Sequence, residues 1–416
     1  MEWIGLLDCN NFFVSCERLF RPDLKNKPVI VLSSNDGCVV ARSQEIKDKG
    51  IPMGIPYFKI KDMIKDIDAT TFSSHFALYR DISRRVFEVM RTELEIVEQY
   101  SVDEAFFIIK GSAEEIEIKI KVVKDKVERL VGIPVSIGVA SSKTQAKYAN
   151  AVAKKTSGIY VMTRDSWNTL ISEMRIGDIW GVGYRLKEQY KMAGLYTVKQ
   201  IIALERRQMD ELFGVGGVRL WLELQGIPAI ELLNKKESKK SILHSRSFRE
   251  TTTDKLVLKD AVAYHIREAA EDLRNQHQKA RILQVALLPG RHGDFFLQGG
   301  TAMVEFPQPS NDTFVFLEAA HRLVERIYKP GVPYKKAGIL MSGFSAENIA
   351  QLSMFEESHD RNTAALMPIL DAINSKKGKG SVMLGSYLKT KKWDSLHESK
   401  SPSYTTSWED LAQVKA

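Results

Sequence analysis

The sequence predicts a multidomain globular protein that mixes helices and strands, with an α/β or α+β core. The first observation is length, because 416 residues at roughly 100–200 residues per domain make two to four domains. The second is the mixture of strand-like and helical segments in residues 1–165, which is typical of a sheet covered by helices. The third is a β-α-β-β-α-β order in residues 242–346, which predicts a small sheet with helices on one face.

Composition excludes several classes of protein. The chain is 44% hydrophobic and 27% charged, which excludes wholesale disorder, collagen and coiled coil. No apolar run approaches the ~20 residues that cross a bilayer, and the N-terminal run is too short for a signal peptide. Cys9, Cys16 and Cys38 are odd in number and unevenly spaced. We therefore expect reduced thiols in a cytoplasmic protein with no membrane partner. A net charge of +8 is weak support for a polyanionic partner.

The elements of the first 165 residues follow from hydrophobic spacing. Short apolar runs bounded by turn formers predict buried strands at 3–7, 27–34 and 134–140. Apolar residues at helical spacing predict helices at 12–20, 41–50, 76–93, 113–131 and 142–155. The segment IVEQYSVDEAFFII, at 96–109, predicts two strand arms around an acidic centre.

The rest of the chain changes character at about residue 166. Residues 166–235 predict short helices punctuated by glycine, and the polar, charged run NKKESKKS at 234–241 predicts a linker. After the strands and helices of 242–346, the last 65 or so residues lose hydrophobic periodicity and carry SKKGKG and KTKKW. We expect a basic, mobile tail there.

Three acidic residues lie beside predicted core strands. Asp8 ends a buried strand, and Asp103 and Glu104 lie between two apolar arms. Buried charges are costly unless they are paired or bound to metal. Adjacent strand residues point to opposite faces, so both acids reach one site only at a turn, which a hairpin tip supplies. Carboxylates without His or Cys favour Mg²⁺ or Mn²⁺. The alternative is a solvated hairpin turn and a strand-capping Asp, and these residues alone leave both open.

Other kinds of site have little support. The eight histidines are scattered, without the spacing of a zinc site. The segment GVASSKT at 138–144 resembles the end of a phosphate-binding loop, but Ser142 stands where the glycine before the lysine belongs. We therefore interpret it as the end of a strand and the start of a helix.

Four segments resemble the blocks of a known protein family. They are LLDCNNFFVSCERLFRPDL, SSNDGCVVARSQEIKDKGIPMGIPYFK, YSVDEAFF and SIGVASSKTQAKYANAVAKK. They are similar to those of Y-family DNA polymerases, and most similar to the UmuC subfamily with its phage- or prophage-borne UvrX-type proteins. The likeness extends from about residue 5 to SPSYTT in the tail.

The resemblance implies an α+β right hand of palm, fingers and thumb, plus a βαββαβ little-finger domain and a basic C-terminal tail. We expect the palm at 1–20 and 75–165, fingers at 21–74, thumb at 166–235, linker at 236–241, little finger at 242–346, and tail at 347–416. The implied activity is template-directed, error-prone DNA synthesis across lesions in SOS-type damage tolerance. The implied substrates are primer-template DNA and deoxynucleoside triphosphates.

The resemblance also implies residue roles. Asp8 and Asp103 match metal-binding aspartates, Glu104 matches the acid beside the primer 3′ end, and the backbone carbonyl of Cys9 matches a further metal contact. Two Mg²⁺ ions are implied, with Mn²⁺ as a substitute. Phe13 matches an aromatic steric gate against the ribose 2′-hydroxyl.

The triphosphate contacts depart from the family pattern at two positions. Gln44 and Lys47 align with a tyrosine and an arginine that hold the triphosphate in many relatives, and Lys154 matches a lysine on the same phosphates. A lysine offers a point charge instead of a bidentate fork, and glutamine offers an amide donor. For Lys47 and Lys154 the alternative is solvated helix charge, and for Phe13 it is core packing beside Phe12.

Several residues are candidates for DNA contacts. Glycine turns let backbone N–H groups approach a phosphate at a helix N-terminus, which predicts contacts in a helix-hairpin-helix-like thumb. In the little finger, basic residues on strand-like segments could face the template backbone or be surface charge. The candidates are Gly181, Gly183, Gly214, Gly216, Arg246, Arg249 and Arg281.

The segment QLSMF at 351–355 resembles the sliding-clamp-binding peptide of bacterial polymerases. Gln351, Leu352, Met354 and Phe355 would then fill pockets on the clamp as an extended peptide; the alternative is packing on the little finger. UmuC relatives also work with a small accessory subunit and a recombinase filament, which are implied partners, and the implied location is the bacterial nucleoid.

Two rival functions remain at this point. A two-metal nuclease would need neither an aromatic gate nor a clamp peptide. A non-catalytic regulator of other polymerases would not need Asp8, Asp103 and Glu104.

Overall fold

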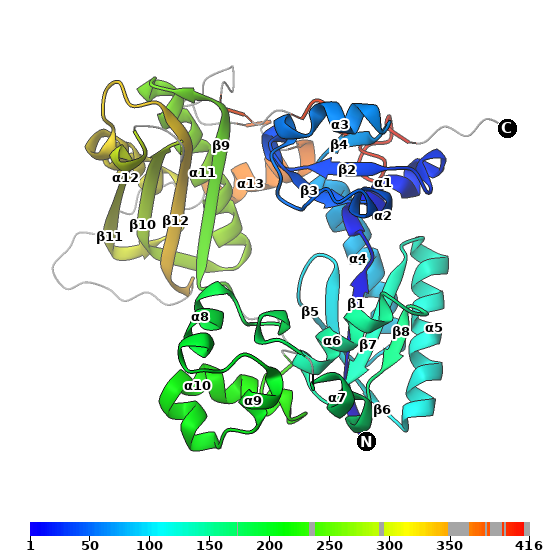
Figure 1. The fold of residues 1–416 in the computed structure, drawn as a ribbon. Helices are drawn as coiled ribbons and strands as arrows, with labels where there is room; N and C mark the ends of the chain where they lie inside the picture. The colour runs from blue at the N-terminus through cyan, green and yellow to red at the C-terminus, as the bar shows by residue number, and fades with distance from the viewer. Residues whose placement is uncertain are drawn as a thin grey trace. The chain divides into compact units, whose positions relative to one another are not determined.

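The computed structural model describes residues 1–172, 174–232, 238–290, 295–347, 366–378, 381–382, 393–394 and 397–411. The chain forms two compact units (Figure 1). Unit 1 is Met1–Lys236 with Ser399–Ala416, and unit 2 is Glu237–Glu398. The boundary falls beside the linker predicted at 236–241. Within the described ranges, no helix is long and apolar enough to cross a membrane.

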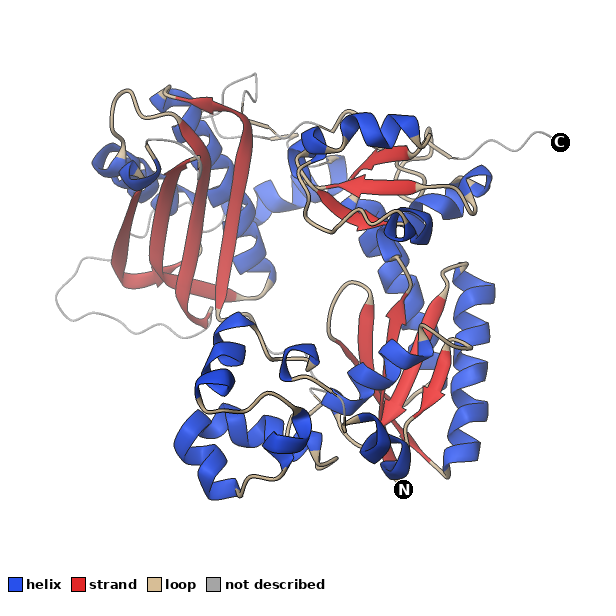
Figure 2. Cartoon of the chain, in the orientation of Figure 1, coloured by secondary structure: helices blue, strands red, loops and turns tan. Residues whose placement is uncertain are grey.

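Three sheets organise the two units (Figure 2). Unit 1 holds a five-stranded sheet ordered β5-β6-β1-β7-β8 and a three-stranded sheet ordered β3-β2-β4, and unit 2 holds a four-stranded sheet ordered β11-β10-β12-β9. The strands are β1 Glu2–Cys9, β2 Val29–Leu32, β3 Val39–Arg42, β4 Thr70–Ser73, β5 Ile96–Gln99, β6 Glu104–Lys110, β7 Val135–Ala140, β8 Ile159–Val161, β9 Ser241–Thr252, β10 Gln278–Pro289, β11 Gly300–Ser310 and β12 Tyr334–Ala346. The helices are α1 Phe12–Phe20, α2 Gln44–Asp48, α3 Lys61–Asp66, α4 Phe76–Glu93, α5 Ala113–Val131, α6 Lys143–Ala153, α7 Arg164–Leu170, α8 Tyr184–Met192, α9 Val198–Ile202, α10 Arg206–Leu224, α11 Lys255–Asn275, α12 Thr313–Ile327 and α13 Leu366–Lys377.

The five-stranded sheet buries both of its faces. Side chains alternate along β1, so Trp3, Leu7 and Cys9 pack with α4 and α5, whereas Ile4 and Leu6 pack with α6 and the helices that follow it. Asp8 shares the second face because its position is even-numbered like theirs. A strand that is buried on both faces has a continuous run of apolar residues. The sequence analysis predicted this strand from such a run.

Helix α6 lies unusually close to the sheet. A Cβ on Gly138 of β7 would come within 2.0 Å of the backbone nitrogen of Asn150. The Asn150 side chain donates hydrogen bonds to the carbonyls of Leu6 and Ser136 at 3.1 and 2.7 Å. These contacts fix the height and rotation of α6 over β1 and β7. Ser142 caps this helix by accepting from the Gln145 N–H, so the interpretation of 138–144 as strand end and helix start is confirmed.

The three-stranded sheet corrects one sequence prediction. The helix expected at 41–50 covers only Gln44–Asp48, because residues 41 and 42 belong to β3. The pattern of buried and half-buried residues along β3 has a period of two, which the following polar helix masked. The short strands β4 and β8 were also missed, because each offers only three or four residues to a periodicity argument.

Residues 164–224 are short helices, as predicted, and glycines separate them. Gly181 has φ 89° and precedes the Gly183 N-cap of α8. Gly214 has φ 61° and ψ −163°, so α10 is two helices that meet at this residue. A left-handed or extended mirror conformation of this kind is readily available only to glycine.

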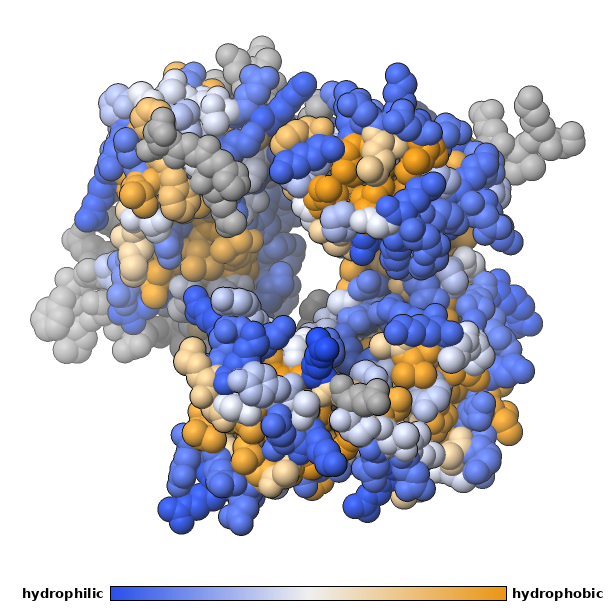
Figure 3. All heavy atoms as spheres, in the orientation of Figure 1, coloured by the Kyte–Doolittle hydropathy of each residue, from blue (hydrophilic) through white to orange (hydrophobic). Residues whose placement is uncertain are grey.

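Unit 2 has the predicted β-α-β-β-α-β order. Its strands are all antiparallel, and α11 and α12 cover the same face of the sheet (Figure 2). The open face carries a mixture of apolar and polar side chains, which shows as orange and blue atoms over the sheet (Figure 3).

We expected a mobile tail after residue 346. For the residues that the structure describes this expectation is wrong, because they pack against the rest of the chain. Asp371 of α13 pairs with Arg274 at 2.6 Å. Trp393 is buried in the core of unit 2 and donates its indole N–H to Asp260. Tyr404 stacks on Phe20 in unit 1 at 4.5 Å. Isolated aromatic anchors in a polar sequence leave no periodic signal, so the sequence pattern did not reveal this packing.

Replacing Gly138 by Ala tests the close approach of α6. The added methyl group would overlap the α6 backbone, and overpacking of this kind costs about 1–3 kcal/mol. We expect the free energy of unfolding, from urea denaturation, to fall by that amount. Gly37→Ala is the matched control, because its nearest neighbour is 3.7 Å away and the variant should stay within about 0.5 kcal/mol of the parent. Equal stability of the two variants would contradict the packing described.

Candidate functional site

Asp8 and Glu104 face each other across two neighbouring strands. They are directly paired in the antiparallel register of β1 and β6, so both side chains emerge on the same face of the sheet, under α6. Asp8 is 8% exposed, and Glu104 is half-buried. Two acidic side chains are thereby held together at one end of the central strands.

Asp103 reaches the same end from the β5–β6 hairpin. The loop of residues 100–103 turns on Ser101, whose hydroxyl accepts from the N–H groups of Asp103 and Glu104 and donates to Asp103 Oδ1 at 2.6 Å. The carbonyl of Asp103 also accepts from Cys9 N at 2.9 Å. The hairpin tip that the sequence analysis required is therefore present. It brings Asp103 beside the end of β1 although Asp103 and Glu104 are adjacent in sequence.

Lysines from α6 neutralise the paired acids. Lys154 lies 2.7 Å from Asp8 Oδ1, and Lys147 holds both oxygens of Glu104 at 2.7 and 2.8 Å. A third pair, Lys143 with Glu98 at 2.6 Å, follows the same pattern. The positions 143, 147 and 154 recur at helical spacing, so one face of α6 presents a row of cations to a row of carboxylates.

The electrostatics of Asp8 show why it needs a cation. Burial raises the pKa of Asp8 to about 7, the charge and hydrogen bond of Lys154 oppose that rise, and Glu104 adds to it. Burial also raises the pKa of the Cys9 thiol, which stays neutral inside the core. The Cys9 side chain packs in the core on the other face of the sheet from Asp8, so the candidate donors at this site are carboxylate and carbonyl oxygens.

This donor set suits a hard divalent ion, although it is not assembled as a metal cage. Across the described ranges, no three His, Cys, Asp or Glu side chains are grouped so as to hold a metal ion as they stand. Lys154 and Lys147 instead pair with oxygens of Asp8 and Glu104. An all-oxygen donor set of carboxylates and a carbonyl fits Mg²⁺ or Mn²⁺.

Phe13 is the second residue of α1, just after the turn that leaves β1. Asn11 adopts the left-handed conformation, with φ 48°, which asparagine tolerates better than most residues. The Phe13 ring stacks on Tyr79 at 4.4 Å and 14° and meets Phe76 edge-on at 6.0 Å. Phe12 is buried, whereas Phe13 stays half-buried. One edge of the Phe13 ring is therefore available to a ligand.

Lys47 lies close enough to Asp8, Lys154 and Arg42 for their charges to act on it. The pKa of Lys47 is lowered by burial and by the charges of Arg42 and Lys154, and Asp8 opposes that effect. Lys47 also donates to the Asn11 side chain. Gln44, in contrast, is exposed and donates to Asp48 at 2.7 Å, within its own helix. The structure thus brings Lys47 and Lys154 together with Arg42, and it leaves Gln44 turned to its own helix.

The glycine turns are open to solvent. A Cβ at any of the four predicted thumb positions would have nothing within 4 Å. No close contact within the chain therefore requires a glycine at these positions. The backbone there is open to a close approach by another molecule. The positions are Gly181, Gly183, Gly214 and Gly216.

The predicted arginines of unit 2 lie in different surroundings. Arg281 pairs with Glu305 at 2.9 Å, and Arg249 is exposed. Arg246, however, is paired in register with buried Ala337, and its guanidinium lies 5.6 Å from the Trp393 ring. Strand alternation directs Arg246 toward the helix-covered side of the sheet, and its predicted contact with DNA stays a prediction.

The clamp-peptide residues Gln351, Leu352, Met354 and Phe355 lie outside the described residues, so that interpretation stays a prediction.

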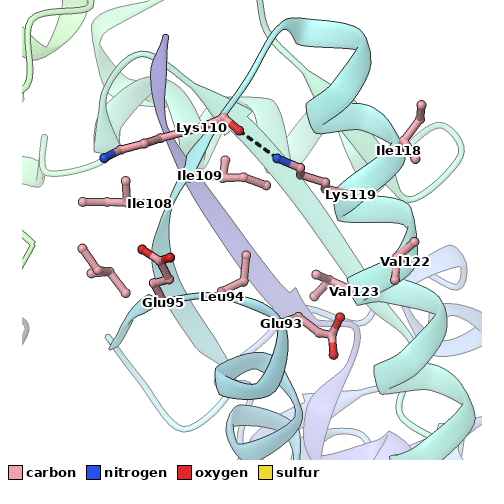
Figure 4. A pocket seen from close by; sticks show the side chains of 11 residues that line it. Glu93, Leu94, Glu95, Ile108, Ile109, Lys110, Ile118, Lys119, Val122 and Val123 are labelled. Carbon is pink, nitrogen blue, oxygen red and sulfur yellow. Dashed lines mark hydrogen bonds between the residues drawn. The ribbon is translucent and has the colours of Figure 1, made fainter.

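A surface pocket of about 360 Å³ lies away from the carboxylates (Figure 4). Leu94, Ile108 and Val122 line it, and Lys119 crosses it to the carbonyl of Lys110. Lys110 is opposite Glu2 in the β1–β6 register, whereas Glu104 is opposite Asp8. The pocket is thus at the other end of the strands, roughly 20 Å from the acids.

Sequence reasoning missed three residues of this site. Lys147 and Arg42 are ordinary charges in a helix and a strand, and Tyr79 is an ordinary core position of α4. A signal for Lys147 was present, because positions 143, 147 and 154 share a helix face. No sequence pattern around Arg42 or Tyr79 indicated that they lie near Lys47 and Phe13, respectively.

Comparison with protein families gives independent information. Models of the impB/mucB/samB family and of its C-terminal domain match residues 7–151 and 239–354. A further model, of a domain of unknown function, matches residues 364–414.

Individual relatives cover nearly the whole chain. "Protein UmuC" of Salmonella typhimurium is 35% identical over 99% of this chain and 100% of its own length. "Protein ImpB" of Salmonella typhimurium is 35% identical over 98% of both chains. "DNA polymerase IV 2" of Bacillus subtilis is 25% identical over 92% of this chain and 94% of its own length.

Solved structures agree on the fold. A Y-family DNA polymerase chimera named for Dbh and Dpo4 superposes with a TM-score of 0.67 at 18% identity, over 83% of this chain and 99% of that one. An insertion ternary complex of Dbh DNA polymerase gives a TM-score of 0.54 at 18% identity, over 82% and 98%. The α+β right hand with a little finger is thus confirmed, and the chain belongs to the impB/mucB/samB family, the UmuC branch of the Y-family DNA polymerases.

Proposed function

We propose that this protein extends a primer 3′-hydroxyl with deoxynucleoside triphosphates on a DNA template, as an error-prone lesion-bypass polymerase in SOS-type damage tolerance. The observation that carries the proposal is the register pairing of Asp8 with Glu104, with Asp103 beside them, at one end of the central strands. Relatives named as DNA polymerases favour this activity over a nuclease or a non-catalytic regulator.

Asp8, Asp103 and the carbonyl of Cys9 would hold two Mg²⁺ ions, with Glu104 beside the primer end. Two such ions lower the pKa of the attacking hydroxyl and stabilise the departing pyrophosphate. The primer oxygen forms a bond to the α-phosphorus, and the bond from that phosphorus to the pyrophosphate oxygen breaks. The carboxylates keep these groups in line, and such positioning makes up most of phosphoryl-transfer catalysis.

Lys154 pairs with Asp8, and the charges of Lys154 and Arg42 both act on Lys47. With a metal held by Asp8, the ammonium group of Lys154 would be available to another anion. We infer that these three cations hold the triphosphate, with a smaller share from Gln44, which is paired with Asp48. The charge that protects the buried acid in the free protein would thus serve the substrate in the complex.

Other expected partners follow from the same proposal. Open backbone at the four thumb glycines would hold DNA phosphates, and Arg249 and Arg281 are the little-finger candidates that remain. The segment 351–355 would bind a sliding clamp. A small accessory subunit and a recombinase filament remain proposed partners, and a bacterial nucleoid location remains a proposal.

Replacing Asp103 by Ala tests the carboxylate site. No neighbouring acid is placed to substitute, so primer extension with Mg²⁺ should fall by roughly a thousandfold or more. Primer-template binding should persist, since thumb and little finger provide it. Asp125→Ala on the exposed side of α5 is the control and should keep full activity. Extension above a few per cent of the parent in the Asp103 variant would show the assignment to be wrong.

Replacing Phe13 by Ala tests the steric gate. Removing the ring should admit ribonucleotides and lower the preference for deoxynucleotides by about tenfold or more, because the gate excludes the 2′-hydroxyl by contact. Phe13→Tyr keeps the ring and should keep the preference. The measurement is the ratio of kcat/KM for the two sugars. An unchanged ratio in a folded Phe13→Ala variant would favour simple core packing.

Changing Leu352, Met354 and Phe355 together to Ala tests the clamp peptide. Binding energy in such interfaces is concentrated in a few buried anchors of ~2 kcal/mol or more each, so clamp affinity should fall by orders of magnitude. Clamp-free primer extension should stay nearly unchanged. Ser353→Ala, inside the same segment, is the control for titration against clamp. Equal loss of both properties in the triple variant would mean that these residues pack into the fold.

A further inference from the structure

The end of the chain returns to unit 1 after it has crossed unit 2. Residues 399–411, which we call the return segment, fall in the match to a domain of unknown function and belong to unit 1. The segment is folded on itself, since the carbonyl of Ser403 accepts from Thr406 N and Ser407 N, and Asp410 accepts from Ser403 N. It is therefore an ordered part of the polymerase unit, and its purpose is unassigned.

Three contacts fasten the return segment to unit 1. Ser399 and Ser73 exchange two hydrogen bonds, both 3.0 Å long, at the end of β4. Ser401 is buried, and its hydroxyl lies 3.1 Å from His75 Nδ1. The Tyr404 ring stacks flat on Phe20, with 9° between the planes. The segment thus contacts the last turn of α1 and the residue that precedes α4.

The contacted helices are the two that carry the gate. On α1, Phe13, Glu17 and Phe20 follow at spacings of four and three, so they lie on one face. On α4, His75 is the N-cap and Tyr79 lies one turn further along. The return segment therefore meets the same helix faces that hold the Phe13 and Tyr79 rings in their stack.

A buried carboxylate joins the two helices beneath the stack. Glu17 is 1% exposed, and its Oε1 accepts from the Tyr79 hydroxyl at 2.6 Å. Burial raises the pKa of Glu17, and the hydroxyls of Tyr79 and Ser401 lower it in part. Tyr79 is thereby held at its hydroxyl by Glu17 and at its ring by Phe13. The return segment covers this arrangement at Ser401 and at Phe20.

We propose that the return segment is a positioning element of the sugar gate, which sets the place of Phe13 through α1 and α4 and makes sugar selection depend on the C-terminal end of the chain. The proposal rests on the role of Phe13 given above. Steric exclusion is sensitive to small displacements, because a shift of about 1 Å in a positioned group changes rates by up to a hundredfold. Loss of the Tyr404 ring would leave the outer side of Phe20 without its partner and free α1 to shift.

The test compares three single variants in the full chain. Tyr404→Ala should lower the ratio of kcat/KM for deoxynucleotides over ribonucleotides by about three- to tenfold, mainly by a gain in ribonucleotide use. Tyr404→Phe keeps the stacked ring and should keep the ratio. Trp408→Ala, in the same segment but 90% exposed, is the matched control and should behave as the parent. An unchanged ratio in a folded Tyr404→Ala variant would overturn the proposal.

A double variant separates positioning from general stability. If the segment acts through Phe13, then Phe13→Ala with Tyr404→Ala should select sugars no worse than Phe13→Ala alone, because coupled residues are non-additive. Additive losses would overturn the proposal in favour of an independent effect. Should Tyr404→Ala fail to fold, Ser401→Ala removes the hydroxyl that lies 3.1 Å from His75 Nδ1, and this variant replaces Tyr404→Ala in the same scheme. If Phe13 is not a steric gate, Phe13→Ala alone will leave the ratio unchanged. That result is distinguishable from failure of the present proposal.

Discussion

The pairing of two acidic side chains across β1 and β6 is the constraint on which the rest of the polymerase unit depends. Asp8 and Glu104 are placed opposite each other by the strand register, in a position where burial is the largest cause that raises the pKa of Asp8, which reaches about 7 although Lys154 opposes the rise. A buried carboxylate needs a compensating cation. Lys154 and Lys147 supply it in the structure, and in the proposed complex divalent metal would share that role.

Helix α6 is therefore more than a covering layer. It carries the lysines opposite Glu98, Glu104 and Asp8, and the contact of Gly138 with its backbone sets how near they come. On the other face of the sheet, α1 and α4 carry the Phe13 and Tyr79 stack. One β-sheet thus separates the acids proposed to bind metal from the packing that supports the proposed gate. Substitutions on the two faces should consequently affect different kinetic properties.

Much of the fold could be predicted from the sequence wherever a clear local pattern, such as a helix cap or an apolar run, marked an element. Helix α5 has the predicted bounds of 113–131, because Ser112 and Glu115 form a capping box and Gly132 ends the helix with φ 80°. The acids were identified because charge beside a buried strand is unusual. The partners of those acids were not, since surface-like lysines acquire meaning only when α6 is placed over the sheet. The packing of Arg246 and of the tail was not predicted for a related reason, because their contacts join residues more than a hundred positions apart.

The most direct measurement is the anomalous scattering of Mn²⁺ in crystals of the protein with primer-template DNA and an incoming nucleotide. The account predicts two manganese peaks roughly 3.5–4 Å apart, both within ligand distance of the Asp8 and Asp103 carboxylates, with Lys154 displaced from Asp8 toward the triphosphate. A complex with bound nucleotide in which Lys154 still pairs with Asp8, and in which no manganese lies between the two aspartates, would contradict it.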